Sequence, residues 1–359
     1  MADLKNVLVK INKDFGQGVA TVGVPKDLTD RIPTGIFQFD LATGGGIPQG
    51  KVSIIYGSES SGKTTLTLKL IAFVQRVLGK KAVFIDLENS LDMEWAEKCG
   101  VLIDELVVMH PDTAEQTVDI VEAVLYADDV GIVVLDSLGA MTTENEIQSG
   151  ADKMTLGGAS LIVGKMIRKA VAAMNSQKKQ GFMPTLVLIN QVRIKIGVMF
   201  GDPETMPGGN AVRFASSLSV RLYGKDKIIK EVHSSLPAFK EVSAIIKKWK
   251  VPVVSRSFEY ELCLVPHDGL NLLDSPSWGT VSSFLKKHGV IRKEGLKWFC
   301  DDVEFPTLGA IQQAYETTPE LRLALQQEVV KREMQKPLAP QAPPEKKGGQ
   351  SVSEPKSEE

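Results

Sequence analysis

The segment from Gly57 to Thr65 constrains the fold of this chain more than any other. It reads Gly-Ser-Glu-Ser-Ser-Gly-Lys-Thr-Thr, follows the apolar run 52–56 and leads into the apolar run 66–72. Glycines that permit a tight turn, followed by Gly-Lys-Thr at the start of a helix, are typical of a loop that wraps phosphates with backbone N–H groups. The sequence therefore predicts a strand, a phosphate-binding loop and a helix in succession, with a nucleoside triphosphate as the first ligand to consider.

The side chains of this loop have separate expected roles. Lys63 is expected to reach the β and γ phosphates, and the hydroxyl of Thr64 to hold Mg²⁺. The phosphates also lie at a helix N-terminus, where the backbone dipole favours negative charge. The residues expected to bind the nucleotide are Gly57, Ser58, Glu59, Ser60, Ser61, Gly62, Lys63, Thr64 and Thr65.

Length and charge set broad limits. A chain of 359 residues is longer than a typical single domain, so we expect one large core domain with smaller additions. The formal charge is -2 and 24% of residues are charged, so any nucleic-acid surface must come from local clusters of Lys and Arg. Net charge neither supports nor excludes DNA as a partner.

The cysteines and the apolar segments indicate a compartment. Cys99, Cys263 and Cys300 are far apart and form no C-x-x-C pair, which disfavours a disulfide framework and a zinc site. No segment approaches the roughly 20 apolar residues of a membrane span. We therefore expect a cytoplasmic protein without membrane contact.

The middle of the chain predicts a doubly wound α/β core. From 33 to 268, apolar β-branched runs alternate with helical stretches, and the continuous apolar run 132–135 is what a strand buried on both faces requires. We expect a mostly parallel sheet with later antiparallel strands at one edge. The expected strands are 52–56, 82–86, 106–110, 131–136, 185–190, 217–223, 242–249 and 257–264.

Three further segments flank this core. Residues 1–32 contain an amphipathic helix, with apolar residues from Leu4 to Phe15 at helical spacing, which either packs on its own domain or reaches a neighbouring subunit. Residues 269–335 mix aromatic with basic residues and predict a small α+β domain. Residues 336–359 are rich in Pro, Gln, Ser, Gly and Glu and lack aromatic residues, so we expect a disordered tail.

Two acids follow predicted strands, at the edge where open α/β sheets bind ligands. Glu88 comes shortly after the strand 82–86 and is the candidate general base that activates water for attack on the γ phosphate. Asp136 ends the strand 131–136, in the form of a Walker B strand whose carboxylate holds Mg²⁺ through water. A lone acid at a strand end, such as Glu88, could instead be a helix cap or part of a solvated loop. For Asp136, the place of its strand downstream of the phosphate-binding loop argues against an acid that only begins a turn.

The next strand delivers an amide to the same edge. Gln191 directly follows the strand 185–190, and an amide at this place can sense the γ phosphate by hydrogen bonding. The segment 193–210 that follows is interrupted by Gly and Pro and is apolar for a surface loop. Long irregular loops in compact domains are usually functional or disordered, so this segment is interpreted as a switch.

Taken in order, these motifs resemble the bacterial RecA family of DNA strand-exchange recombinases. The likeness covers about residues 5–265. The motifs that carry it are the segments 57–65, 86–92, 133–137, 190–201 and 208–211.

The resemblance implies a helical filament on single-stranded DNA, with ATP and Mg²⁺ between adjacent subunits. It assigns phosphate and metal contacts to Lys63 and Thr64, catalysis to Glu88 and sensing to Gln191. Trp95 stands where the family has an adenine-stacking aromatic. Lys248 and Lys250 match a Lys-x-Lys pair that reaches the γ phosphate of a neighbouring subunit, although lysines at such a place can also simply guard a strand edge.

The resemblance also implies two DNA-binding loops. The second loop matches well, with Ile196 as an apolar wedge between base triplets. The first, about 144–157, matches less well, since Leu156 stands where the family usually has Met. The helix after it carries Lys165, Arg168 and Lys169, which suit phosphates, although a basic helix face is often only solvated. The residues expected to bind DNA are Gly157, Arg168, Arg193, Ile196, Gly208, Gly209 and Asn210.

Three functional hypotheses remain at this point. The first is an ATP-dependent recombinase that pairs single-stranded DNA with homologous double-stranded DNA, with loading proteins and a repressor as further candidate partners. The second is a ring-forming, helicase-like motor with the same ATPase core. The third is a regulatory scaffold whose filament promotes cleavage of a repressor. The C-terminal domain aligns poorly with the family, although its basic cluster fits a gateway for duplex DNA, and the tail lacks the family's strong acidity.

Overall fold

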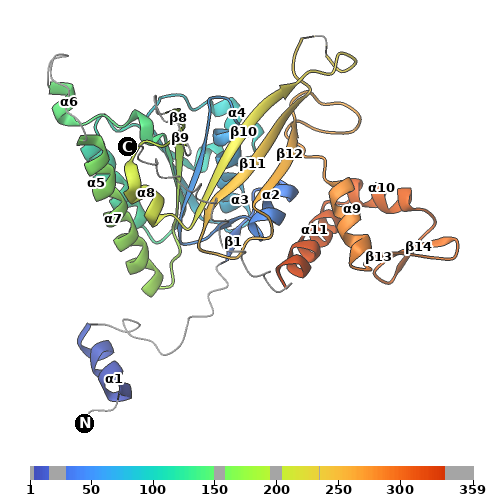
Figure 1. The fold of residues 1–359 in the computed structure, drawn as a ribbon, viewed down its shortest axis with the longest axis horizontal. Coiled ribbons are helices and arrows are strands. Elements are labelled where there is room, and N and C mark those ends of the chain that lie inside the picture. Colours follow the sequence, from blue (N-terminus) through green and yellow to red (C-terminus); the bar gives the residue numbers. More distant parts are fainter. Residues whose placement is uncertain (1–3, 16–29, 149–157, 195–203, 234, 336–359) are drawn as a thin grey trace, which may run out of the picture.

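The computed structural model describes residues 4–15, 30–148, 158–194, 204–233 and 235–335 (Figure 1). Its main sheet has eight strands in the order β12-β11-β10-β3-β7-β6-β4-β5. These strands are β3 Val52–Gly57, β4 Lys81–Asp86, β5 Leu106–Met109, β6 Val130–Asp136, β7 Thr185–Gln191, β10 Leu218–Lys227, β11 Phe239–Trp249 and β12 Ser257–Cys263.

The strand directions confirm the expected fold class. Neighbouring strands from β10 to β5 run parallel, whereas β11 is antiparallel to both β10 and β12. Strand β6 is buried along its whole length, as its continuous apolar run predicts. Because all the parallel strands end at one edge, the residues that follow β3, β4, β6 and β7 lie near one another there.

Helices cover both faces of the sheet (Figure 1). On one face α3 (Lys63–Arg76) and α4 (Met93–Lys98) join a large hydrophobic cluster, and on the other α5 (Ala114–Leu125), α7 (Gly158–Lys179) and α8 (Gly209–Ala215) join a second one. The shorter elements are β1 Arg31–Ile32, α2 Phe37–Thr43, β2 Ile47–Pro48, η1 Ile103–Glu105, η2 Leu138–Ala140, α6 Glu144–Gln148, β8 Arg193–Ile194 and β9 Glu204–Thr205.

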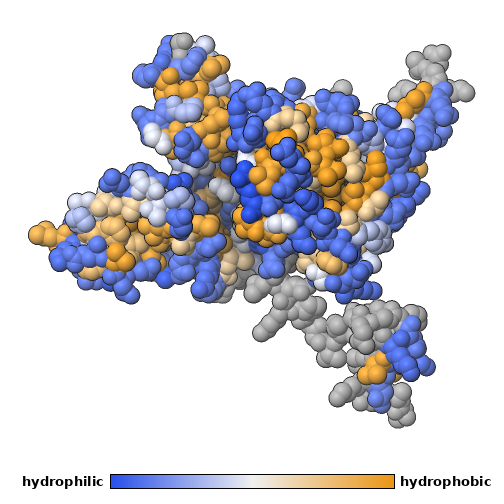
Figure 2. Space-filling view, turned by 180° about the vertical axis from the view of Figure 1, so that it is seen from behind, coloured by the Kyte–Doolittle hydropathy of each residue, from blue (hydrophilic) through white to orange (hydrophobic). Residues whose placement is uncertain are grey.

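The C-terminal segment forms a small α+β unit beside the sheet (Figure 1). Its elements are α9 Trp278–Lys287, β13 Ile291–Glu294, β14 Lys297–Cys300, β15 Val303–Phe305, α10 Leu308–Thr317 and α11 Pro319–Met334. Its hydrophobic cluster also takes in Phe37 and Leu41 of α2, so this unit packs against the segment that leads into the core. Figure 2 shows hydrophobic residues at the far tip of this unit. Leu296, in the turn between β13 and β14, is 91% exposed.

The N-terminal helix α1 (Leu4–Phe15) has the extent that its apolar spacing predicts. Within the described residues, none of the hydrophobic clusters includes a residue of α1. Val7 and Val9 on this helix are 39% and 64% exposed. The three cysteines are buried and free. In the described part of the chain, no helix is both long and apolar enough to cross a bilayer.

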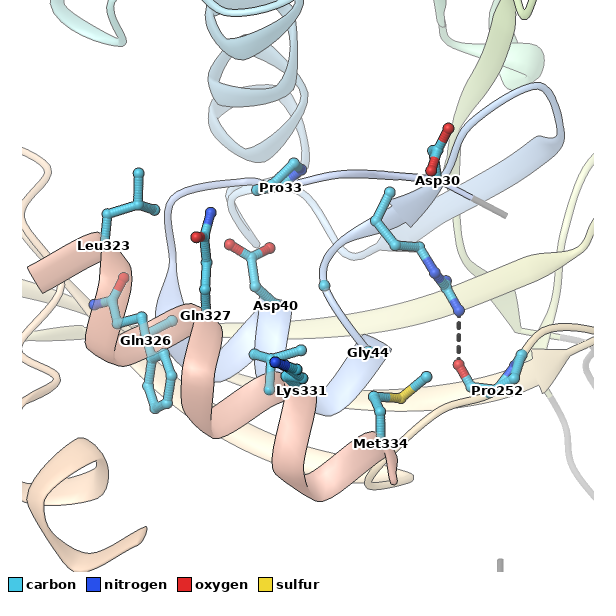
Figure 3. A pocket seen from close by; sticks show the side chains of 14 residues that line it. Asp30, Pro33, Asp40, Gly44, Pro252, Leu323, Gln326, Gln327, Lys331 and Met334 are labelled. Carbon is cyan, nitrogen blue, oxygen red and sulfur yellow. Dashed lines mark hydrogen bonds between the residues drawn. The ribbon is translucent and has the colours of Figure 1, made fainter. Parts of the chain in front are cut away.

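A cavity of about 390 Å³ lies where α2 meets α11 (Figure 3). The carboxylate of Asp40 lies at this cavity and accepts hydrogen bonds from Thr34 N at 2.8 Å, from Thr34 Oγ1 at 2.9 Å and from Gly35 N at 3.0 Å. Burial raises the pKa of Asp40 to about 7, although these hydrogen bonds and the charge of Lys69 oppose the shift.

This raised pKa predicts a pH-dependent stability. Between the unfolded value of 3.8 and the folded value of about 7, the folded chain binds the proton more tightly, so stability falls as the pH rises through this range. We expect this carboxyl to lower the free energy of unfolding by roughly 3 kcal/mol between pH 5 and pH 8. Urea titrations of the wild type and of Asp40→Asn check this, because the variant should lose that part of the pH dependence. Equal pH profiles would contradict it.

Candidate functional site

The segment 57–65 adopts the conformation of a phosphate-binding loop between β3 and α3. A Cβ on Gly57 would lie 2.3 Å from Ser61 Oγ, so only glycine fits there. Gly62 precedes α3 with φ +88°, a left-handed conformation that glycine adopts without strain. The Lys63 amine donates to the carbonyls of Ser58 at 2.7 Å and Gly57 at 3.3 Å, which holds it over the loop.

The charge of Lys63 depends on its surroundings. Burial lowers the pKa of this amine, and the charge of Arg221 lowers it further, whereas Asp136 and Glu88 act in the opposite direction. Three carboxylates, with Glu59 as the third, and a second cation therefore lie within electrostatic range of the lysine. A triphosphate bound at the loop would meet a positive charge that its own negative charge stabilises.

A cavity of about 400 Å³ opens beside the loop, lined by residues 60–65 and by Trp95. The indole Nε1 of Trp95 donates to Thr65 Oγ1 at 3.1 Å, and the helix that carries this residue begins with Asp92 accepting from the backbone N of Trp95 at 3.0 Å. The aromatic ring thus lies against the nucleotide-binding loop, at the place expected for contact with a base.

Asp136 lies at the end of β6 and accepts a hydrogen bond from Thr64 Oγ1 at 3.1 Å. Burial raises the pKa of Asp136 to about 6, while the hydrogen bond from Thr64 opposes the shift and the charge of Glu88 adds to it. A hydroxyl and a carboxylate in contact beside a phosphate-binding loop have the oxygen donors that Mg²⁺ prefers, so these two residues fit the metal.

Glu88 is held at the same edge by its neighbours. Asp86 accepts from the backbone N of Glu88 at 3.2 Å and from Leu91 N at 2.9 Å, which shapes the turn after β4. The Oε1 atom of Glu88 accepts hydrogen bonds from Ser137 Oγ at 2.5 Å and from Gln191 Nε2 at 3.0 Å. The side chain is exposed, so water can reach it. The two acids and the amide expected from sequence are therefore brought together.

Ser137 is a site residue that sequence analysis did not assign. The signal for it is its place directly after Asp136, at the end of a buried strand and within the motif 133–137. It holds the candidate base, which explains why a hydroxyl is useful at this position.

The described ends of the segment after Gln191 are regular, unlike the irregular form expected for 193–210, and residues 195–203 lie outside the described residues. Its two ends pair as short strands, with Arg193 opposite Thr205 in the β8–β9 hairpin. The buried Asn190 donates to Pro207 O at 2.9 Å, so the end of β7 is tied to the far end of this segment. Gly208 then begins α8 with φ +89°, and a Cβ there would lie 2.9 Å from Val212.

Arg221 also holds this hairpin, and the sequence reading did not assign it. Lying on β10 opposite Tyr56 of β3, it is 4% exposed. Its Nη2 and Nε donate to Glu204 Oε1 at 2.9 Å and Oε2 at 3.1 Å, and its guanidinium lies 4.1 Å from the centre of the Tyr223 ring. Burial lowers the pKa of Arg221, but Glu204 more than compensates and raises it.

The expected lysine pair lies apart from this cluster. Lys248 donates to the carbonyls of Arg213 and Phe214, and Lys250 to Phe214 O at 2.7 Å, so both lysines cap the end of α8. Burial and the charges of Lys250 and Arg213 lower the pKa of Lys248. Neither lysine lines the nucleotide cavity of its own chain.

The other expected DNA-binding residues are placed only in part. Arg168 is exposed on α7, whereas Lys169 beside it pairs with Glu122 and with Asp119, so less of this basic face is available than expected. Arg193, Gly209 and Asn210 are exposed. Gly157 and Ile196 lie outside the described residues.

Comparison with known proteins identifies the family. The model of the RecA N-terminal domain matches residues 2–263. Protein RecA of Colwellia psychrerythraea is 37% identical over 303 residues, or 83% of this chain and 83% of the relative. Protein RecA of Methylococcus capsulatus is 40% identical over 263 residues, or 71% of this chain and 72% of the relative. A crystal structure of the RadB recombinase is 18% identical, with a TM-score of 0.47 over 64% of this chain and 96% of that one. The chain belongs to the RecA family of bacterial recombinases and is an ATP-dependent recombinase.

Proposed function

We propose that this recombinase forms a helical filament on single-stranded DNA, pairs that strand with homologous double-stranded DNA and couples strand exchange to ATP hydrolysis. The observation that carries this proposal is the hydrogen bond of 3.0 Å between Gln191 and Glu88. It joins the candidate base to the residue from which the second DNA-binding segment departs. A change at the γ phosphate can therefore alter the position of that segment, and DNA bound there can alter catalysis.

The contacts support the following chemical roles. Lys63 neutralises the β and γ phosphates, and the backbone of residues 57–65 cradles them. Thr64 would hold Mg²⁺, and Asp136, which accepts a hydrogen bond from its hydroxyl, would hold the metal through water. Trp95, beside Thr65, would contact the base. Glu88 orients and deprotonates the attacking water, while Ser137 fixes its carboxylate.

We propose that DNA lies along the edge formed by α7, β8 and α8. Arg168 and Arg193 are exposed cations there, and Gly208, Gly209 and Asn210 place backbone N–H groups at the start of α8. Gly157 and Ile196, which lie outside the described residues, are proposed to bind DNA as well. Since such contacts go to phosphates and to the DNA backbone, little sequence preference is expected, and base pairing selects the homologous duplex.

A neighbouring subunit completes the nucleotide site in this proposal. Glu88 and Gln191 are exposed rather than enclosed, which leaves room for groups of a second chain. Lys248 and Lys250 would reach the γ phosphate of that neighbour. Residues 1–32 would form the arm between subunits, because Val7 and Val9 expose apolar surface on α1.

The C-terminal domain, residues 269–335, is proposed as a gateway for duplex DNA. Basic side chains lie over aromatic rings there, with Lys286 at 5.6 Å and Lys293 at 5.8 Å from the ring of Trp298. This arrangement suits a surface that attracts phosphates. We place the protein in the cytoplasm, with loading proteins and a repressor as further candidate partners. The tail 336–359 lies outside the described residues.

One pair of experiments tests this function against the ring-forming motor. Gel shifts and electron microscopy on single-stranded DNA, with and without a slowly hydrolysed ATP analogue, should give helical filaments only with the analogue. Closed rings would favour the motor. A strand-exchange assay with a homologous and a heterologous duplex then measures the coupled reaction, and equal products from both duplexes would contradict recombination.

The role of Lys248 across the subunit interface predicts complementation between two inactive variants. Lys248→Ala keeps Glu88, and Glu88→Gln keeps Lys248, so a filament of both contains some interfaces with both groups. Random mixing of equal amounts makes this about a quarter of the interfaces. ATP hydrolysis on single-stranded DNA should therefore return in the mixture, up to about that fraction of the wild-type rate.

The control is a mixture of Glu88→Gln with the double variant Glu88→Gln, Lys248→Ala. Both chains lack Glu88, so no interface regains a complete site and no activity should return. If the mixture with the single variant Lys248→Ala also stays inactive, the lysine serves only to cap α8 in its own chain.

A further inference from the structure

The ion pair between Arg221 and Glu204 joins two parts of the chain that the proposed function treats as separate sites. Arg221 belongs to β10, where it lies opposite Tyr56, one residue before the first glycine of the phosphate-binding loop. Glu204 belongs to β9, at the end of the segment that follows Gln191. The pair is bidentate, with distances of 2.9 Å and 3.1 Å, so it fixes direction as well as distance.

The surroundings make this pair stiff. Arg221 is 4% exposed, donates as well to the carbonyl of Leu222 and lies over the ring of Tyr223. A guanidinium so held moves only when its strand or its partner moves. Strand β10 continues past the phosphate-binding loop, since a Cβ on Gly224 would lie 2.7 Å from Ser61 Cα. A displacement of the β8–β9 hairpin is therefore transmitted through β10 to the phosphate-binding loop.

Electrostatics give the pair a second connection to the nucleotide. The guanidinium of Arg221 lies within electrostatic range of the amine of Lys63. The guanidinium is therefore part of the positive surroundings of the phosphate-binding loop.

We propose that Arg221 and Glu204 form a positioning latch that couples nucleotide binding to DNA binding, in addition to the contact between Gln191 and Glu88. This inference rests on the proposal that the segment between β8 and β9 grips DNA. Neither residue touches the reacting atoms. The latch acts by placing the hairpin relative to the phosphate-binding loop.

Glu204→Gln is the test variant, because it keeps the shape of the side chain and removes its charge. Anisotropy of a labelled oligo-dT gives the dissociation constant with and without a slowly hydrolysed ATP analogue, and the ratio of the two constants is the coupling factor. The coupling factor should fall at least about fivefold in the variant. Affinity for the analogue in the absence of DNA should stay within about twofold, which shows that the fold and the nucleotide site are intact.

Two comparisons separate a latch from a merely structural contact. Glu261→Gln removes the same charge from the pair with Lys227 at 2.8 Å, near the other end of β10, and should leave the coupling factor unchanged. A double-mutant cycle adds Arg221→Gln and the variant that carries both changes. The variant with both changes should lose no more coupling than Glu204→Gln alone.

Several outcomes would overturn the latch. An unchanged coupling factor in Glu204→Gln would do so, as would additive losses in the cycle or an equal loss of analogue affinity without DNA. If the wild type shows no ATP-dependent DNA binding, the proposed function itself fails, and the latch fails with it. This last result is seen before any variant is compared.

Discussion

Replacing Lys63 with alanine is expected to lower ATP hydrolysis on single-stranded DNA by at least ~100-fold and to remove ATP-dependent DNA binding. Lys63 is 9% exposed, and its amine is held by two carbonyls of the loop that would cradle the phosphates. Both ATP hydrolysis and DNA binding should be lost, because a triphosphate that is not bound cannot position the DNA-binding segment. Nucleotide binding by a fluorescent ATP analogue and hydrolysis on single-stranded DNA measure it.

The matched control is Lys98→Ala. Lys98 lies on α4 and pairs with Glu94 at 2.6 Å on the exposed surface, where such pairs contribute little to stability. This variant should keep wild-type hydrolysis and DNA binding. Near-normal ATP-driven filament formation by Lys63→Ala, with the control unchanged, would contradict the assignment of Lys63.

Strands and loop positions could be predicted because each depends on local sequence. The continuous apolar run in β6 has a single explanation as a buried strand. The segment from Gly57 to Thr65 contains the glycines of a tight turn, the start of a helix and the charge of Lys63 within nine residues. The order of the strand ends then placed Glu88, Asp136 and Gln191 at one edge of the sheet. The hydrogen bond between Gln191 and Glu88 agrees with that placement.

The contacts of Arg221 could not be predicted in the same way. They depend on the register of β10 against β3 and on the pairing of β8 with β9, which join residues far apart in the chain. In sequence, Arg221 is one charged residue within a strand, and Glu204 one acid within a segment rich in Gly and Pro. Only the fold shows that they meet.

The packing of the C-terminal domain could not be predicted from sequence either, because it also depends on contacts between residues far apart in the chain. Phe37 and Leu41 precede the phosphate-binding loop, and their apolar side chains could belong to the core as easily as to a distant partner. In the fold they lie with Leu325 and Val329 of α11 in one cluster. A composition change near residue 269 indicates where a new unit begins, but not which surface it packs against.

Replacing Glu88 with glutamine is expected to separate ATP binding from ATP hydrolysis. Both hydrogen bonds to the side chain, from Ser137 and from Gln191, end on the same oxygen, Oε1. A glutamine can keep both through its single carbonyl oxygen, so the contact that joins the nucleotide site to the DNA-binding segment is retained. What is lost is the ability to accept a proton from water.

Hydrolysis by Glu88→Gln should therefore fall by roughly 1000-fold, whereas ATP-dependent binding to single-stranded DNA should stay close to wild type. Steady-state phosphate release and DNA binding by anisotropy measure the two quantities, with the exposed Glu97→Gln on α4 as the control that should change neither. If DNA binding fell together with hydrolysis, the side chain would be part of the coupling rather than a base alone. If hydrolysis persisted, another group would be the base.

The same variant also tests the scaffold hypothesis, provided that it still binds DNA. A filament that only promotes repressor cleavage should remain active without ATP turnover.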